Sequence, residues 1–111
     1  MEISVDRPGK GKVVITPSGK VDAETSSRLK DEFRTISDES PEVVIVDLAA
    51  VDFLDSSGLS ALVSGLKTLR GKGAQFRLSG PRPQALTALR LTMLHRVFPI
   101  FDTVEAALQS G

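Results

Sequence analysis

Hydrophobic and polar positions change their spacing along the chain, and the spacing predicts alternating short strands and helices. Near the start, Ile3 and Val5 alternate with polar neighbours, a turn with two glycines follows, and residues 13–15 form a second apolar run. Two such runs around a turn are typical of a β-hairpin. Residues 43–46 are an uninterrupted β-branched run, which predicts a strand buried on both faces in the middle of a sheet.

The spacing becomes helical after Asp22, where apolar residues recur every three or four positions. Asp22 is well suited to cap this first helix. Three further helices are predicted, and they begin after Asp55, at Pro83 and after Asp102. Strands at 76–78 and 97–101 separate these helices, and the second belongs at a sheet edge because Pro99 cannot donate to a ladder.

This order of elements indicates one α/β domain over residues 1–111. It predicts a mixed β-sheet of about four to five strands flanked by about four helices. A chain of 111 residues is long enough to bury one core but not two. The pattern shows no linker, internal repeat or low-complexity run that would divide the domain.

Composition removes several classes of function. The chain has 14 Lys and Arg against 14 Asp and Glu, no cysteine, and a single histidine, His95. Balanced charge argues against direct nucleic-acid binding and against a polybasic membrane surface. Without thiols and with one imidazole, we expect no metal site and no cofactor. No stretch of the sequence approaches the roughly 20 apolar residues that span a bilayer, so we also expect no membrane segment. A small, soluble, cytoplasmic domain remains, poorly equipped to be an enzyme.

Residues 51–59 hold the densest candidate chemistry, between the most apolar strand and the most regular helix. Asp55, Ser56 and Ser57 stand together at the predicted helix start, with Gly58 directly after them. A helix N-terminus tolerates an anion well, so a phosphate on Ser56 or Ser57 would not unfold the domain. The simpler interpretation is that Asp55 or Ser56 is only an N-cap, and it stays open at this point.

Two features favour a docking surface over a plain cap. Gly58 inside the first turn costs up to about 1 kcal/mol relative to alanine, which suggests that something approaches the backbone closely. Beyond it, small residues are expected to keep the outer side of the helix flat: Ser60, Ala61, Ser64 and Gly65. Phe53 and Leu54 would add an apolar patch. We therefore expect Phe53 and Ser60 to contact a partner.

The segment 55–59, Asp-Ser-Ser-Gly-Leu after an apolar strand, resembles the phosphorylation segment of bacterial anti-sigma factor antagonists, the founding members of the STAS domain family. Two flanking segments occur in the right order. Residues 19–22, Gly-Lys-Val-Asp, are similar to the family's Gly-x-Leu/Val-Asp before its first helix, and residues 94–101 are similar to its closing segment. The resemblance covers nearly the whole chain.

The resemblance implies a STAS-like mixed sheet flanked by helices and a partner-switching mechanism. In the unphosphorylated state such a protein binds an anti-sigma factor, itself a serine kinase, and so frees the sigma factor. Phosphorylation of Ser56 would abolish that binding, and a metal-dependent serine phosphatase would restore it. Ser57 and Gly58 would shape the docking surface, Asp55 would position Ser56 or contact the kinase, and Asp22 would join the interface from a neighbouring loop. The protein would be a cytoplasmic bacterial phosphoprotein that regulates transcription.

The chain departs from the family pattern at one place. Many members have a glycine before the leucine that follows the third helix, whereas this chain has Met93 before Leu94. Met93 itself is expected in the core. The departure concerns the end of the third helix and leaves the phosphorylation segment unaffected.

Two alternatives remain open. In the first, the protein is an enzyme with Ser56 as nucleophile and His95 as base, although the surrounding residues lack the Gly-x-Ser-x-Gly elbow. In the second, it is a STAS scaffold or regulatory module of a stress-signalling or lipid-transport complex that does not act directly on a sigma factor. A scaffold should form a large assembly, whereas a simple antagonist should be a monomer or weak dimer.

Overall fold

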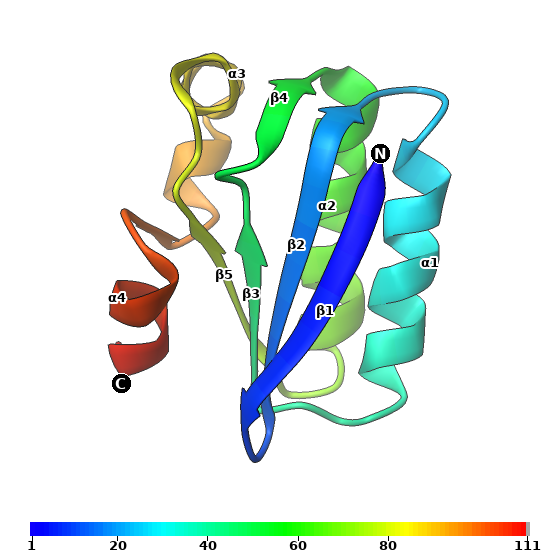
Figure 1. Ribbon diagram of the computed structural model, residues 1–111, viewed down its shortest axis with the longest axis vertical. Helices are drawn as coiled ribbons and strands as arrows, with labels where there is room; N and C mark the ends of the chain where they lie inside the picture. Colours follow the sequence, from blue (N-terminus) through cyan, green and yellow to red (C-terminus); the bar gives the residue numbers. More distant parts are fainter. Residues whose placement is uncertain (111) are drawn as a thin grey trace.

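A mixed six-stranded sheet organises the protein, as the computed structural model of residues 1–110 shows (Figure 1). The strands are β1 (Glu2–Gly9), β2 (Lys12–Val21), β3 (Val43–Asp47), β4 (Val51–Leu54), β5 (Gln75–Ser79) and β6 (Ile100–Phe101). The helices are α1 (Ser26–Ser37), α2 (Ser56–Arg70), α3 (Pro83–Leu91) and α4 (Val104–Gln109), with a 3₁₀ turn, η1 (Leu94–Arg96), after α3. The predicted mixed α/β domain with four helices is confirmed.

The strand order is β1-β2-β3-β5-β6, with β4 paired to β2 outside this row. β1 and β2 form the predicted antiparallel hairpin, and the pairs β2–β3, β3–β5 and β5–β6 are parallel. β3 lies in the middle of the sheet, as its β-branched run predicts, and Val44, Ile45 and Val46 are fully buried. β6 lies at an edge, as expected, but is shorter than residues 97–101.

β4 was not predicted, and it gives the sheet one strand more than expected. β2 is long enough to pair with two strands in succession. Its first half, Lys12–Ile15, pairs with β3, and its second half, from Gly19 to Val21, pairs with β4. β3 and β4 therefore follow one another along the same side of β2, and β4 leads into α2 (Figure 1).

Side chains on the two faces of the sheet enter different cores. Val13, Ile15 and Val44 face α1 and α2 and belong to the main core. The alternate residues Val14 and Ile45 belong to a smaller cluster with Ala107 of α4. Helices α1 and α2 thus cover one face, and α4 covers part of the other.

The N-cap of one helix differs from the prediction. The N-cap of α1 is Thr25, and the N-cap of α4 is Thr103, whose hydroxyl accepts a hydrogen bond from the Ala106 N–H at 3.1 Å. The prediction of Asp22 as the cap of α1 is wrong, because the helix begins at Ser26, four residues after Asp22. The last helix does begin after Asp102, as predicted. Asp22 instead shapes the loop before α1.

Three side chains expected elsewhere also need correction. Ala61 and Gly65 do not lie on the outer side of α2, since both are buried. A Cβ on Gly65 would lie 2.5 Å from the Phe33 ring, so these small residues let α1 and α2 pack closely. Met93 is not in the core either, because 49% of it is exposed.

Among the described residues, no helix is both long and apolar enough to cross a bilayer.

Candidate functional site

The candidate site lies where β2 and β4 end side by side. These strands are parallel, and Val21 at the end of β2 pairs with Leu54 at the end of β4. The Asp55 N–H continues the ladder by donating to the Val21 carbonyl at 3.3 Å. Because parallel strands bring their carboxyl ends to one edge, the loop after Asp22 and the segment after Asp55 become neighbours. The structure thus brings together the two segments that the sequence singled out.

Asp55 is the N-cap of α2. Its backbone is extended, and its carboxylate accepts a hydrogen bond from the Gly58 N–H at 3.0 Å. The capping interpretation of Asp55 is therefore confirmed. Capping also places Ser56 at the first position of the helix, with its side chain exposed to solvent. In the described part of the chain, no hydrogen bond engages the Ser56 hydroxyl, so that hydroxyl is accessible for modification.

Gly58 is buried, and the close approach to its backbone comes from within the protein. A Cβ at this position would lie 2.5 Å from both the Val21 carbonyl oxygen and the Leu54 Cδ1. Val21 and Leu54 therefore account for the close approach expected at Gly58, and a contact of Gly58 with a partner stays a prediction. Gly58 allows the first turn of α2 to sit against the ends of β2 and β4, and so sets the position of Ser56.

Asp22 is held in a tight turn beside this helix start. Its carboxylate accepts hydrogen bonds from the N–H groups of Glu24 at 3.0 Å and Thr25 at 3.2 Å. The Thr25 hydroxyl accepts from the Asp22 N–H and donates to the Lys20 carbonyl, both at 2.9 Å. Asp22 is half-buried. Its fixed loop forms one wall of the site.

The outer surface of the site is partly apolar. Phe53 on β4 is 42% exposed and is one of the exposed large hydrophobic side chains of the described residues. Ser60 is exposed one turn beyond Ser56, whereas Ser57 is half-buried. Ser56 and Ser60 lie four residues apart and so share one face of α2. Phe53, Ser56 and Ser60 are the predicted site residues that the structure leaves most open.

Sequence reasoning missed two residues of α3 and its entry that hold this surface in place. The Gln84 side chain accepts from the Leu54 N–H at 2.8 Å and donates to the Leu54 carbonyl at 2.9 Å. Arg82 donates to the Ala49 carbonyl and to the Asp52 carboxylate, both at 2.8 Å. Gln84 thus satisfies the free edge of β4 as another strand would. The only signal in the sequence was the polar Arg-Pro-Gln at a helix start, which is common on surfaces.

The rival enzymatic interpretation finds no support in the local geometry. His95 lies on η1, and its Nδ1 atom is buried without a hydrogen-bond partner among residues 1–110. No hydrogen bond in that range links His95 to Ser56. Within the same range, no three His, Cys, Asp or Glu side chains gather as a metal site would require. What the site offers is an exposed hydroxyl at a capped helix start, and an exposed aromatic side chain on the strand that leads into that helix.

Comparison with known proteins gives a consistent result. The family model described as the STAS domain matches residues 4–107. An anti-sigma F factor antagonist from Paenibacillus polymyxa is 26% identical over 100 residues, which cover 89% of this chain and 86% of the relative. The crystal structure of an anti-sigma factor antagonist from Mycobacterium paratuberculosis superposes with a TM-score of 0.87 and 29% identity, covering 96% of this chain and 90% of the other.

A third similarity concerns the fold alone. The Bacillus cell fate determinant SpoIIAA in its phosphorylated form superposes with a TM-score of 0.76 at 19% identity, covering 96% of each chain. The unphosphorylated form of the anti-sigma factor antagonist SpoIIAA gives 0.83 at 18% identity, over 96% of this chain and 93% of the other. The sequence match spans almost the whole domain, and the topology agrees with it. The chain belongs to the STAS domain family.

Proposed function

We propose that this protein is an anti-sigma factor antagonist that acts as a phosphorylation-controlled switch between partners. Unphosphorylated, it binds an anti-sigma factor that is a serine kinase, and that binding releases a sigma factor. Phosphorylated at Ser56, it no longer binds. A serine phosphatase reverses the modification. In this role the protein is a cytoplasmic substrate and binding surface, and the catalysis belongs to the kinase and the phosphatase.

The observation that carries this proposal is the placement of Ser56. Its hydroxyl is exposed at the first position of a capped helix, three residues after Phe53, whose ring is also exposed. A kinase needs an accessible hydroxyl, and a partner needs an apolar contact that it can bury. The names of the relatives described above, which are anti-sigma factor antagonists, support the same interpretation.

A phosphate on Ser56 would have different effects on the fold and on the complex. Within the fold, the N-terminus of α2 favours the added charge of about −1.5 to −2, so the domain should stay folded. At an interface the same charge must lose its water, which costs several kcal/mol unless the partner pairs it. Because about 1.4 kcal/mol is a factor of ten in affinity, one phosphate is enough to release a partner.

The remaining site residues have separate roles in this proposal. Phe53 supplies the apolar contact, and Ser60 and the half-buried Ser57 lie on the surface that the partner covers. Asp55 fixes the helix start and so presents Ser56 to the kinase. The loop of Asp22 forms the neighbouring wall. Gly58 acts from beneath the surface, through the close packing described above.

Phosphorylation by the cognate kinase with Mg-ATP tests the proposal. Intact-mass analysis should show one added phosphate on the wild type and on Ser57→Ala, and none on Ser56→Ala. Ser56→Asp should bind the kinase at least about tenfold more weakly by titration calorimetry, with a melting temperature close to that of the wild type. A phosphate mapped to another residue, or undiminished binding by Ser56→Asp, would contradict the mechanism.

A further inference from the structure

An exposed apolar cluster at the end of α3 has no role in the switch described above. Leu91 is 80% exposed, Met93 49% and Val97 43%, whereas most other large apolar side chains of the described residues are buried or half-buried. These three lie within seven consecutive residues, alongside exposed Arg90 and Arg96. We call these five residues the α3–η1 knob. Exposed large apolar side chains that occur together with basic neighbours favour an interaction surface.

The knob belongs to a part of the chain without negative charge. No Asp or Glu occurs between Asp55 and Asp102. The basic residues in this stretch are Lys67, Arg70, Lys72, Arg77, Arg82, Arg90 and Arg96. Because the whole chain is neutral, the remaining segments carry an equal negative excess. Neither Arg90 nor Arg96 forms an ion pair with another described residue.

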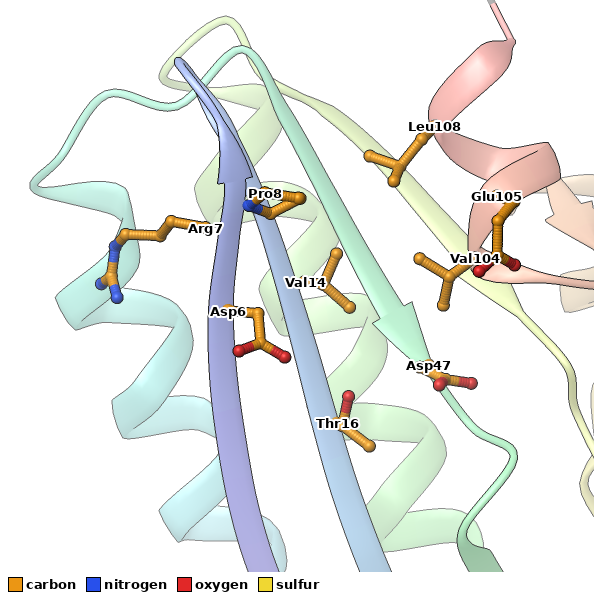
Figure 2. A pocket seen from close by; sticks show the side chains of 9 residues that line it. All are labelled: Asp6, Arg7, Pro8, Val14, Thr16, Asp47, Val104, Glu105 and Leu108. Atoms are coloured by element: carbon orange, nitrogen blue, oxygen red, sulfur yellow. The ribbon is translucent and has the colours of Figure 1, made fainter.

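A groove with complementary chemistry lies between the β1–β2 hairpin and α4, where helices leave the sheet uncovered (Figure 2). Its volume is about 550 Å³. Its apolar lining includes Val14, Val104 and Leu108, which Figure 2 shows pointing into the space between the sheet and α4. Its carboxylates are Asp6, Asp47 and Glu105. We call this the α4 groove.

The α4 groove has little positive charge of its own. Arg7 also lines it, but its guanidinium points away toward α1 in Figure 2. There it forms an ion pair with Glu39, with Nε 2.9 Å from Oε1. In the described chain, Asp6 and Glu105 are exposed and form no ion pair. A partner that fits this groove is therefore apolar with basic flanks.

We propose that the α3–η1 knob of one copy docks into the α4 groove of a second copy. Leu91, Met93 and Val97 would meet the half-buried Val104 and Leu108 above the buried Val14, while Arg90 and Arg96 would face the carboxylates at the rim. Both halves of the contact are present on one neutral chain with opposite charge, which is why a second copy is the favoured occupant. The contact joins different surfaces, so each added copy leaves a free knob and a free groove.

This association is separate from the phosphorylation switch. Neither the knob nor the groove includes the predicted site residues around Ser56. Docking should be weak, because the apolar area is modest, and it should weaken as salt screens the charged rim. We therefore expect a monomer in dilute solution and short oligomers only at high protein concentration, unlike the stable large assembly expected of a scaffold. Ser56→Asp should form these oligomers as the wild type does. Loss of the switch and loss of self-association are thus distinguishable outcomes.

Charge reversal on each surface tests the proposal by sedimentation velocity over a concentration series. The knob variant is Arg90→Glu with Arg96→Glu, and the groove variant is Asp6→Lys with Glu105→Lys. Each alone should associate about tenfold more weakly than the wild type, because its knob and groove then carry charge of the same sign. Mixing the two in equal amounts should restore association, since each knob again meets a groove of opposite charge.

A matched control reverses the charge of Lys67 and Arg70 on α2. Both side chains are exposed and belong to the same acid-free stretch, but they lie outside the knob. The variant Lys67→Glu with Arg70→Glu should associate as the wild type does. Circular dichroism melts check that every variant is folded.

Wild type that remains monomeric at millimolar concentration overturns the proposal, and so does failure of the mixture to associate. Knob-dependent binding to vesicles with anionic lipids, without self-association, would assign the knob to a membrane surface instead.

Discussion

Two residues show how single positions control the local backbone near the functional surfaces. Gly58 has no Cβ, and this absence allows α2 to begin against the ends of β2 and β4. Met93 shows the opposite case, because it adopts φ of 62° although it is not a glycine. This is the position where the family pattern has glycine. The chain therefore keeps the left-handed turn after α3, and the backbone is strained there because Met93 has a Cβ.

Replacing Met93 with glycine should stabilise the folded protein. Glycine removes a left-handed strain of about 1–2 kcal/mol, and its greater freedom in the unfolded chain offsets part of the gain. We expect a net increase of up to about 1 kcal/mol in the free energy of unfolding, measured by urea denaturation in dilute protein. Leu91→Gly, at an exposed helical position with negative φ, is the control and should lose stability. A lower midpoint for Met93→Gly would contradict this account.

At the scale of elements, a side chain of helix α3 forms backbone hydrogen bonds with β4 that a neighbouring strand would otherwise form. β4 pairs with β2 along one edge, and Gln84 occupies the backbone groups of Leu54 on the other edge. Arg82 holds the approach to β4 through Ala49 and Asp52. The strand that carries Phe53 is therefore fixed from both sides, although it has only four residues.

Gln84→Leu should loosen β4 while leaving the rest of the sheet intact. The change removes two hydrogen bonds and leaves the Leu54 N–H and carbonyl without partners, at a cost of about 1–3 kcal/mol in unfolding free energy. Amide exchange should accelerate at Leu54 but not at Val46 in β3. Thr87→Leu, an exposed change one turn further along α3, should have neither effect. Unchanged protection at Leu54 would show that Gln84 does not hold the strand.

The elements that the sequence predicted well are those with a periodic pattern of their own. The run at 43–46 and the apolar stripes of the helices specify their structure locally, so β3 and the four helices were predicted. β4 has no such pattern, because Val51 and Leu54 are buried while Asp52 and Phe53 between them are exposed. Its existence depends on β2 and on Gln84, which lies thirty residues away. For the site, local rules predicted an N-cap at Asp55 or Ser56, but they did not predict that Gly58 packs against Val21 and Leu54.

At the scale of the molecule, the net charge is zero, but acidic and basic residues are distributed unevenly among the elements. The acid-free stretch from Ser56 to Phe101 forms α2, β5, α3 and β6, and the excess of acids lies on the other elements. One contact within the acidic part joins the end of β1 to the end of α1. There the hydrogen bond and the positive charge of Arg7 lower the pKa of Glu39, and Glu39 in turn raises the pKa of Arg7.

This contact predicts a pH dependence with a defined sign. Because the pKa of Glu39 is lower in the folded state than in the unfolded state, the pair stabilises the protein above the unfolded value, near 4.3. That contribution disappears as the pH falls through the folded value. The stability difference between wild type and Glu39→Gln should therefore be present at neutral pH and vanish in acid. It should be small, since both side chains are exposed.

Thermal melts at a series of pH values measure this difference. Glu24→Gln serves as the control, because Glu24 is exposed and its side chain forms no ion pair with another described residue. Its stability difference from the wild type should stay flat across the same range. A difference for Glu39→Gln that grows toward low pH would reverse the predicted sign.

The pairing of β4 with the end of β2 has a consequence for recognition. Two hydrogen bonds hold the backbone just before Ser56: the Asp55 N–H donates to the Val21 carbonyl, and the Leu54 N–H donates to the Gln84 side chain. Val21 lies earlier in the sequence than this segment, and Gln84 lies later. A synthetic peptide with the sequence of residues 51–60 would keep the serines but lose both supports. A protein that reads this surface therefore reads a conformational epitope rather than a linear motif. Searching other sequences for the short string alone would return many segments that no such partner could bind.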